Sequence, residues 1–271
     1  MTIDRQELLA VACKAAEAGA SVAMGWRSRA GSLGIEEKTG PRDLVSRADR
    51  ETETAIRSVL SAQRCDDGVI GEEGGASAGT SDVLWAVDPI DGTTNYLYGR
   101  PDWAVSIAAV RRSDRQILVG VVVEPMLGWI TVASSGGGTF VGDQRIAMRS
   151  DRVLSEALVE VNLGREDQRP VSGPMITALA PLVRDVRRGG SAASALAQVA
   201  TGRADAVWAP GLQPWDCAAG ALLVAEAGGV IGDLSGLTPG TWPQSGDVLA
   251  AGPKLWEQIR DLLKPVYGNT V

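Results

Sequence analysis

The sequence predicts an α+β fold for the 271-residue chain, as one large domain or two closely joined halves. Apolar residues recur at near-helical spacing from about residue 4 to residue 26, which indicates an amphipathic helix. Apolar, β-branched runs separated by turn residues fill the stretch 103–133 and indicate an antiparallel meander. Short strands and helices then alternate, which is typical of an α/β layer. We therefore expect an N-terminal α+β half, about 1–145, and a C-terminal α/β half, about 146–271.

Local patterns predict the other elements of the first half. A polar loop is expected at 31–41 and a second helix at about 44–60. The apolar run Val83–Val87 indicates a buried strand that ends in a turn at Asp88–Thr94. Three strands and a hairpin should follow, at Trp103–Val110, Ile117–Glu124, Trp129–Ala133 and Phe140–Gln144.

The second half should alternate strand and helix. Strands are expected at Ala157–Val161 and Ala204–Trp208, and helices at Pro174–Val183 and Ser191–Thr201. The stretch 214–229 is apolar nearly all round, which predicts a buried helix closed by Gly228.

Composition excludes several classes of protein. A net charge of −7 and a pI near 4.8 argue against nucleic acid as the main partner. No apolar run approaches the roughly 20 residues of a membrane helix, and the N-terminus lacks a signal-peptide pattern. We therefore expect a cytoplasmic protein with no membrane partner. Three cysteines, odd in number and far apart, indicate reduced thiols rather than disulfides.

The chain contains no histidine. This excludes the Ser-His-Asp triad, Cys-His nucleophile activation and every site in which histidine binds zinc or iron. If the protein is an enzyme, its chemistry must come from carboxylates, hydroxyls, backbone groups or metal ions.

The turn after the first buried strand offers two carboxylates. Pro89 fixes one backbone angle and Gly92 permits a conformation that a side chain would forbid, so Asp88 and Asp91 can converge on one point. With the carbonyl of Ile90, they would suit a hard cation such as Mg²⁺. The alternative is an ordinary turn, because Asp-Pro and Asp-Gly are common turn dipeptides.

Other polar residues also have a structural and a functional interpretation. Glu72, among glycines, is either presented to a ligand or part of an acidic surface loop. Asp216 starts a buried helix and either caps it or binds a cation. Ser191 either caps a helix or helps to meet an anion there. Lys38 and Asp49 are either functional or solvated charges of a loop and a helix.

Several segments together resemble one known family. GEEGG at 71–75, DPIDGTTNY at 88–96 and WDCAAG at 215–220 resemble, in order and spacing, the signature segments of the inositol monophosphatase family of Mg²⁺-dependent phosphatases. KTGPRDLVSRAD at 38–49 and ATGRADAVW at 200–208 are also similar to family sequence, so the resemblance covers nearly the whole chain.

The resemblance implies roles for individual residues. Two or three Mg²⁺ ions would be held by Glu72, Asp88, Asp91, Asp216 and the carbonyl of Ile90. Thr93 with Glu72 would orient and activate the attacking water, and Lys38 and Asp49 would belong to a mobile loop and its helix near the weaker metal site. Substrate contacts are implied for Ile90, Asp91, Gly92, Thr93, Gly190, Ser191, Ala192 and Asp216.

The resemblance also implies the architecture and the class of reaction. We expect a layered α-β-α-β-α sandwich that forms a homodimer, acts as a single catalytic domain, hydrolyses a small phosphate monoester and is inhibited by lithium. Two metal ions can carry out such hydrolysis without histidine, by activating water and neutralising charge.

One position departs from the family pattern. Inositol-selective members commonly carry Glu seven residues before the Asp of the WD motif, where this chain has Ala209. Inositol 1-phosphate remains the first expected substrate, histidinol phosphate the next, and fructose 1,6-bisphosphate or 3′-phosphoadenosine phosphates further alternatives. A member that binds Mg²⁺ and phosphometabolites without catalysis is the alternative from another class.

Overall fold

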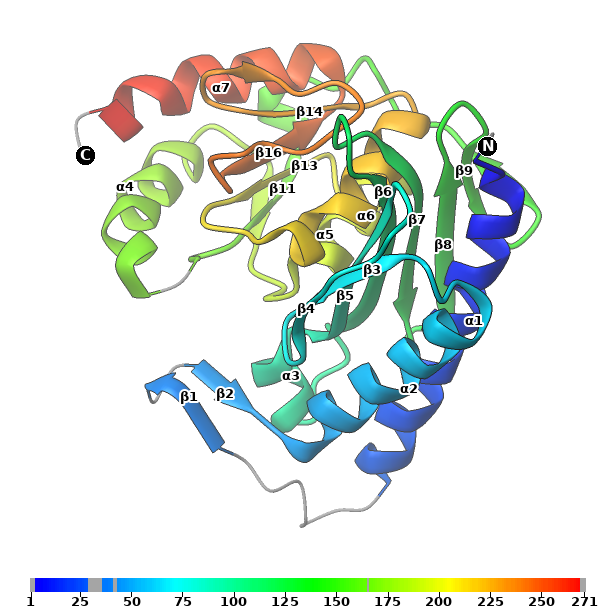
Figure 1. The fold of residues 1–271 in the computed structure, drawn as a ribbon. Helices are drawn as coiled ribbons and strands as arrows, with labels where there is room; N and C mark the ends of the chain where they lie inside the picture. The colour runs from blue at the N-terminus through cyan, green and yellow to red at the C-terminus, as the bar shows by residue number, and fades with distance from the viewer. Residues whose placement is uncertain (1–2, 29–35, 41–42, 165, 269–271) are drawn as a thin grey trace.

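Five layers stack in the order helix, sheet, helix, sheet, helix (Figure 1). The computed structural model describes residues 3–28, 36–40, 43–164 and 166–268. Two long N-terminal helices cover one face of an eight-stranded sheet, a central helix pair lies between that sheet and a six-stranded one, and two further helices cover the outer face of the second sheet. The α-β-α-β-α sandwich expected from the family resemblance is confirmed.

The first layer is a pair of long antiparallel helices, α1 (Arg5–Arg27) and α2 (Arg47–Gln63) (Figure 1). Asp4 caps α1 by accepting hydrogen bonds from the amides of Gln6 and Glu7. Among the described residues, α1 is the one helix long and apolar enough by composition to cross a membrane. The buried face of α1 packs on α2 and on the sheet. Its apolar residues therefore belong to the hydrophobic core.

The eight-stranded sheet places the expected meander at its centre. All neighbouring strands are antiparallel except β3 and β5, which run parallel. Every residue of β7 is buried, because helices cover both faces of the sheet. In spatial order the strands are β10 (Gln144–Ile146), β9 (Gly138–Val141), β8 (Trp129–Ser134), β7 (Ile117–Glu124), β6 (Ala104–Arg111), β5 (Val83–Asp91), β3 (Gly68–Gly71) and β4 (Gly75–Ser77).

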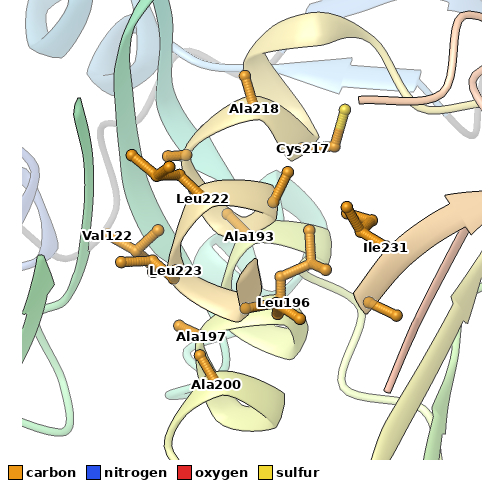
Figure 2. Close-up of a cluster of buried hydrophobic side chains, with 14 of the residues drawn as sticks. Val122, Ala193, Leu196, Ala197, Ala200, Cys217, Ala218, Leu222, Leu223 and Ile231 are labelled. Carbon is orange, nitrogen blue, oxygen red and sulfur yellow. The ribbon is translucent and has the colours of Figure 1, made fainter. Parts of the chain in front are cut away.

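The central layer consists of α5 (Ala192–Ala200) and α6 (Pro214–Glu226). Small side chains let these helices approach each other and the sheet closely: a Cβ on Gly120 of β7 would lie 2.7 Å from the carbonyl oxygen of Ala219. Figure 2 shows side chains of both helices, such as Leu196 and Leu222, meeting in one buried cluster between the sheets. Both helices start at the same end of the sandwich as the carboxylate-bearing segments, and this arrangement positions the site.

The second sheet carries the C-terminal half of the chain. Its outer face is covered by α4 (Arg169–Leu179) and α7 (Pro253–Gly268), which also pack on each other (Figure 1). In spatial order its strands are β12 (Asp185–Arg187), β11 (Leu158–Val161), β13 (Ala206–Ala209), β16 (Val248–Ala251), β14 (Val230–Asp233) and β15 (Gly236–Leu237). The remaining elements are the pair β1 (Glu36–Gly40) and β2 (Asp43–Val45), the short helix α3 (Thr93–Leu97) and two 3₁₀ turns at Leu154–Glu156 and Glu166–Gln168.

Four expectations from local pattern were wrong. The helix expected from about residue 44 begins at Arg47, because Asp43–Val45 forms strand β2. Residues 36–40, expected in a loop, form strand β1; residues 29–35 and 41–42 lie outside the described residues. The helix expected at 174–183 spans 169–179 instead, because Pro170 occupies its first turn, where no amide partner is needed. The strand expected to end at Val87 continues to Asp91.

Gly220 of α6 should be intolerant of a side chain. A Cβ there would lie 2.7 Å from Leu196 Cδ1, so we expect Gly220→Ala to lower the free energy of unfolding by about 1–3 kcal/mol, despite the better helix propensity of alanine. Gly173→Ala in α4 is the matched control, since nothing lies within 4 Å of its added Cβ, and it should stabilise by up to about 1 kcal/mol. Urea unfolding of both variants checks this, and equal stabilisation by both would contradict it.

Candidate active site

A local irregularity in β5 turns two carboxylates toward the same side. Asp88 pairs with Ser106 of β6 and Asp91 with Ala104, so three steps along β5 match two along β6. In a regular strand, residues three apart point to opposite faces, and the extra residue of the bulge removes that opposition. Pro89 lies inside the bulge, where its missing amide costs no ladder hydrogen bond. Gly92 then adopts φ 94° and starts α3.

Glu72 lies beside Asp88 at the ends of two parallel strands. Gly71, the last residue of β3, is in register with Val87, and the amide of Glu72 donates to the carbonyl of Val87 at 3.3 Å. The loop after Glu72 is held by Glu53 of α2, a buried carboxylate that accepts the amides of Glu73 at 2.7 Å and Gly74 at 2.9 Å. An ion pair with Arg57 at 2.5 Å fixes Glu53 in turn.

Asp216 enters from the start of α6. Its carboxylate accepts the amide of Gln213 at 2.7 Å and so completes a capping box, which confirms the capping interpretation. Ser106, the register partner of Asp88, donates to the carbonyl of Trp215 at 2.9 Å. This bond ties the first turn of α6 to the β6 position opposite Asp88.

Asp49 reaches the site from the start of α2. Only 1% of the residue is exposed, so the interpretation of Asp49 as a helix-surface charge was wrong. One carboxylate oxygen accepts the amide and the hydroxyl of Ser46, at 2.8 and 2.6 Å. The other lies 3.2 Å from the Thr93 hydroxyl, which is also 3.2 Å from the carbonyl oxygen of Ile90.

The start of α5 closes the site against Asp91. The carboxylate of Asp91 accepts the hydroxyl of Ser191 and the amide of Ala193, both at 2.6 Å. Ser191 also caps α5 by accepting the amide of Ser194, so its capping role is confirmed. Gly190 precedes it with φ 97°, a conformation that favours glycine.

Burial and mutual repulsion set the electrostatics of these carboxylates. Burial, followed by the charges of Glu72, Asp91, Asp216 and Asp49, raises the pKa of Asp88 well above its ordinary value. Burial also raises the pKa of Asp91 to about 6, although the hydrogen bonds from Ser191 and Ala193 oppose the shift. Strand β5, helices α2 and α6 and the residue that follows β3 thus bring negative charge to one place.

The donor set of this carboxylate group fits a hard cation. Carboxylates and the Ile90 carbonyl are the oxygen ligands that Mg²⁺ prefers, and the chain has no histidine to favour zinc. Like charges gathered around a buried Asp88 are costly unless protons or cations neutralise them. In the part of the chain that the structure describes, no three acidic or thiol side chains are arranged around one ion position as they stand. Protein hydrogen-bond donors already hold the carboxylates of Asp91 and Asp216, so coordination requires side-chain adjustment.

The structure brings together most of the residues that the sequence singled out. Lys38 lies on β1, and its side chain is outside the described residues. Ala209 ends β13, is 1% exposed and belongs to the central apolar cluster, so it offers no polar group to a substrate. Sequence reasoning missed Glu53 and Ser106, whose partners lie 20 and 109 residues away along the chain.

Comparison with known proteins agrees with this geometry. The family model described as "Inositol monophosphatase family" matches residues 4–265. The chain belongs to the inositol monophosphatase family. An inositol-1-monophosphatase of Rhizobium meliloti is 37% identical over 232 residues, covering 83% of this chain and 84% of that protein. The Nus factor SuhB of Pasteurella multocida is 35% identical over 266 residues, covering 97% of each.

A solved structure of the same family has nearly the same fold. The extragenic suppressor protein SuhB of Bartonella henselae superposes with a TM-score of 0.89 at 32% identity, covering 95% of this chain and 98% of that one. The inositol monophosphatase of Anabaena superposes with a TM-score of 0.82 at 28% identity, covering 96% of each chain.

The raised pKa values predict how stability depends on pH in the absence of divalent cations. A carboxyl whose pKa is raised by folding stabilises the protein below its unfolded pKa, and that contribution is lost as pH rises through the folded pKa, which is about 6 for Asp91. Asp88→Asn keeps an acceptor for the Ile90 amide and removes the buried charge. In chelator, we expect this variant to unfold at a higher temperature than wild type at about pH 8, with the difference closing toward pH 5. Asp151→Asn, at an exposed position, is the control and should show no such pH dependence.

Glu53 is expected to hold the loop that carries Glu72. Glu53→Gln keeps one acceptor oxygen but loses the charge that pairs with Arg57 and binds two amides, so we expect a loss of about 2 kcal/mol in unfolding free energy. Amide hydrogen exchange at residues 72–75 should rise together with this loss. Unchanged exchange there, alongside exposed Glu257→Gln as control, would show that Glu53 does not order the loop.

Proposed function

We propose that this protein is a Mg²⁺-dependent phosphatase that hydrolyses a small phosphate monoester. The observation that carries the proposal is the group of carboxylates around buried Asp88, contributed by separate elements. We assign Glu72, Asp88, Asp91, Asp216 and the Ile90 carbonyl as ligands of two or three ions. Family membership supports the same assignment.

The bound ions would activate water and neutralise charge on the phosphoryl and leaving-group oxygens. The protein's own task is to position the water and the phosphate. Thr93 donates toward Asp49 or the Ile90 carbonyl, which leaves its oxygen available to accept a hydrogen bond from the attacking water. Glu72, beside Asp88, is the carboxylate to which that water passes its proton.

Backbone donors would orient the phosphate. The left-handed conformation of Gly92 directs the chain from β5 into α3, and we propose that the amides of Gly92 and Thr93 face the phosphoryl oxygens. Ser191 and Ala192 begin α5, and with Gly190 they would contact the alcohol portion of the substrate. Asp91 orders this segment through its bonds to Ser191 and Ala193.

The residues of the site indicate the reaction more clearly than they indicate the alcohol portion of the substrate. Relatives named inositol-1-monophosphatase support inositol 1-phosphate as the first candidate, while the absence of a carboxylate at Ala209 keeps histidinol phosphate and other small phosphates as alternatives. We propose that the chain acts as a single catalytic domain in a cytoplasmic homodimer and is inhibited by lithium. Lys38, on β1, would contribute to the loop near the weaker metal site.

Asp91→Asn is the decisive variant for this function. Asparagine keeps an acceptor for Ser191 and Ala193 but removes the charge, so turnover should fall by about a hundredfold or more while the fold persists. The measurement is phosphate release with Mg²⁺ from inositol 1-phosphate, histidinol phosphate, fructose 1,6-bisphosphate and 3′-phosphoadenosine 5′-phosphate, with Asp151→Asn as the control.

A binding protein without catalysis would give a different result. Wild-type protein would then bind these monoesters with Mg²⁺ and release no phosphate from any of them, and the catalytic proposal would fail. Full activity in Asp91→Asn would instead overturn the metal role of Asp91 alone.

A further inference from the structure

Three arginines lie beside the segment that would contact the alcohol portion of the substrate. Arg188 starts the Arg188–Gly190 turn that leads into Ser191, Arg100 follows α3, and Arg169 begins α4. Asn95 joins two of these segments, because its amide nitrogen donates to the carbonyls of Asp102 and Gly189, each at 2.6 Å. The arginines belong to an otherwise acidic protein with a net charge of −7.

The guanidinium of Arg188 folds back over its own turn. A Cβ placed on Gly190 would lie 2.8 Å from Arg188 Nη1 and 3.0 Å from Asn95 Nδ2. Ser191, the next residue, donates to Asp91 at 2.6 Å. The positive charge of Arg188 therefore lies at the segment that leads into Ser191, where the alcohol portion of the substrate is expected.

The positive charge of these arginines is only partly balanced within the described structure. Arg100 pairs with Asp102 at 2.9 Å, but no described side chain forms an ion pair with Arg188 or Arg169. The Nε atom of Arg169 is buried without a hydrogen-bond partner among the described residues. Partial burial, and then the charges of Arg169 and Arg100, lower the pKa of Arg188. Like charges held together in this way favour an anion between them.

The start of α4 also approaches the loop that follows Ala209. A Cβ on Gly211 would lie 2.8 Å from Gln168 Cγ, and Gln168 immediately precedes Arg169. This loop leads to Asp216 at the start of α6. At Ala209, where the family resemblance implies a Glu in inositol-selective members, this chain has a buried methyl group, so the negative charge of that Glu is absent.

We propose that Arg188, with Arg169 and Arg100, forms a second anion-binding subsite, and that the preferred substrate carries a phosphate or carboxylate on its alcohol portion in addition to the phosphate that is hydrolysed. The proposal rests on the proposed phosphatase function and narrows its substrate class. Arginine suits this role because its planar guanidinium binds both anions through paired hydrogen bonds.

Matched substrates test the subsite. Fructose 1,6-bisphosphate and fructose 1-phosphate differ by one phosphate, and 3-phosphoglycerate and glycerol 3-phosphate differ by a carboxylate. We expect wild-type protein with Mg²⁺ to prefer the member with two anionic groups in at least one pair by about tenfold in kcat/KM, mainly through a lower KM. The preference should shrink as ionic strength rises, because salt screens partly exposed charges.

Variants test whether these arginines cause the substrate preference. Arg188→Gln and the double variant Arg188→Gln/Arg169→Gln should lower the ratio of kcat/KM within each preferred pair toward one. Arg184→Gln is the matched control: it removes an exposed arginine at the opposite end of β12 and should leave the ratio unchanged.

The outcomes separate this proposal from the proposed function. Phosphate release from both members of every pair at equal efficiency, or a preference that survives the double variant, would overturn the subsite and leave the phosphatase intact. Release from no substrate under any condition would overturn the phosphatase function itself.

Discussion

Repulsion among buried carboxylates is the constraint on which the rest of this structure depends. Asp88 is 1% exposed and feels the negative charges of Glu72, Asp91, Asp216 and Asp49. Such a group opposes folding unless something neutralises it, so the surrounding chain must hold each carboxylate firmly. Two of the donors are local, since Ser46 binds Asp49 and Gln213 binds Asp216, whereas the start of α5, which binds Asp91, lies about a hundred residues away along the chain. The carboxylate group at this end of the sandwich therefore has to be neutralised by protons or cations.

The layered architecture supplies the rigidity that this arrangement needs. The central helices α5 and α6 are packed between two sheets through small side chains (Figure 2), and each begins at the carboxylate group. The N-terminal ends of α2, α5 and α6 all point their free amides toward carboxylates, which favours negative charge there. A core built for close approach therefore also fixes the positions of Asp49, Asp91 and Asp216. Packing and chemistry depend on the same helices.

Sequence reasoning succeeded where the signal was local and failed where it was not. The meander was predicted from apolar, β-branched runs separated by turn residues, and Asp88 and Asp91 were found because the residues that form a turn are adjacent in sequence. The bulge in β5 could not be predicted, since it depends on pairing with β6. The contact between Thr93 and Asp49 spans 44 residues and has no local pattern, and the anchoring of Trp215 by Ser106 spans 109. In the sequence, only the family resemblance indicated that the acidic segments belong to one site.

Substrate choice is separable from the chemistry in this molecule because different elements carry them. The carboxylates lie on β5, α2 and α6 and directly after β3, whereas the arginines lie before α5, at the start of α4 and after α3. Ala209 is buried in the central apolar cluster, so it offers the substrate no hydrogen-bonding partner and does not alter the carboxylates around Asp88. A pocket that loses a polar partner rejects the substrate that needed it, and one that gains a positive charge favours an anion. The same hydrolytic machinery can in this way serve a different alcohol.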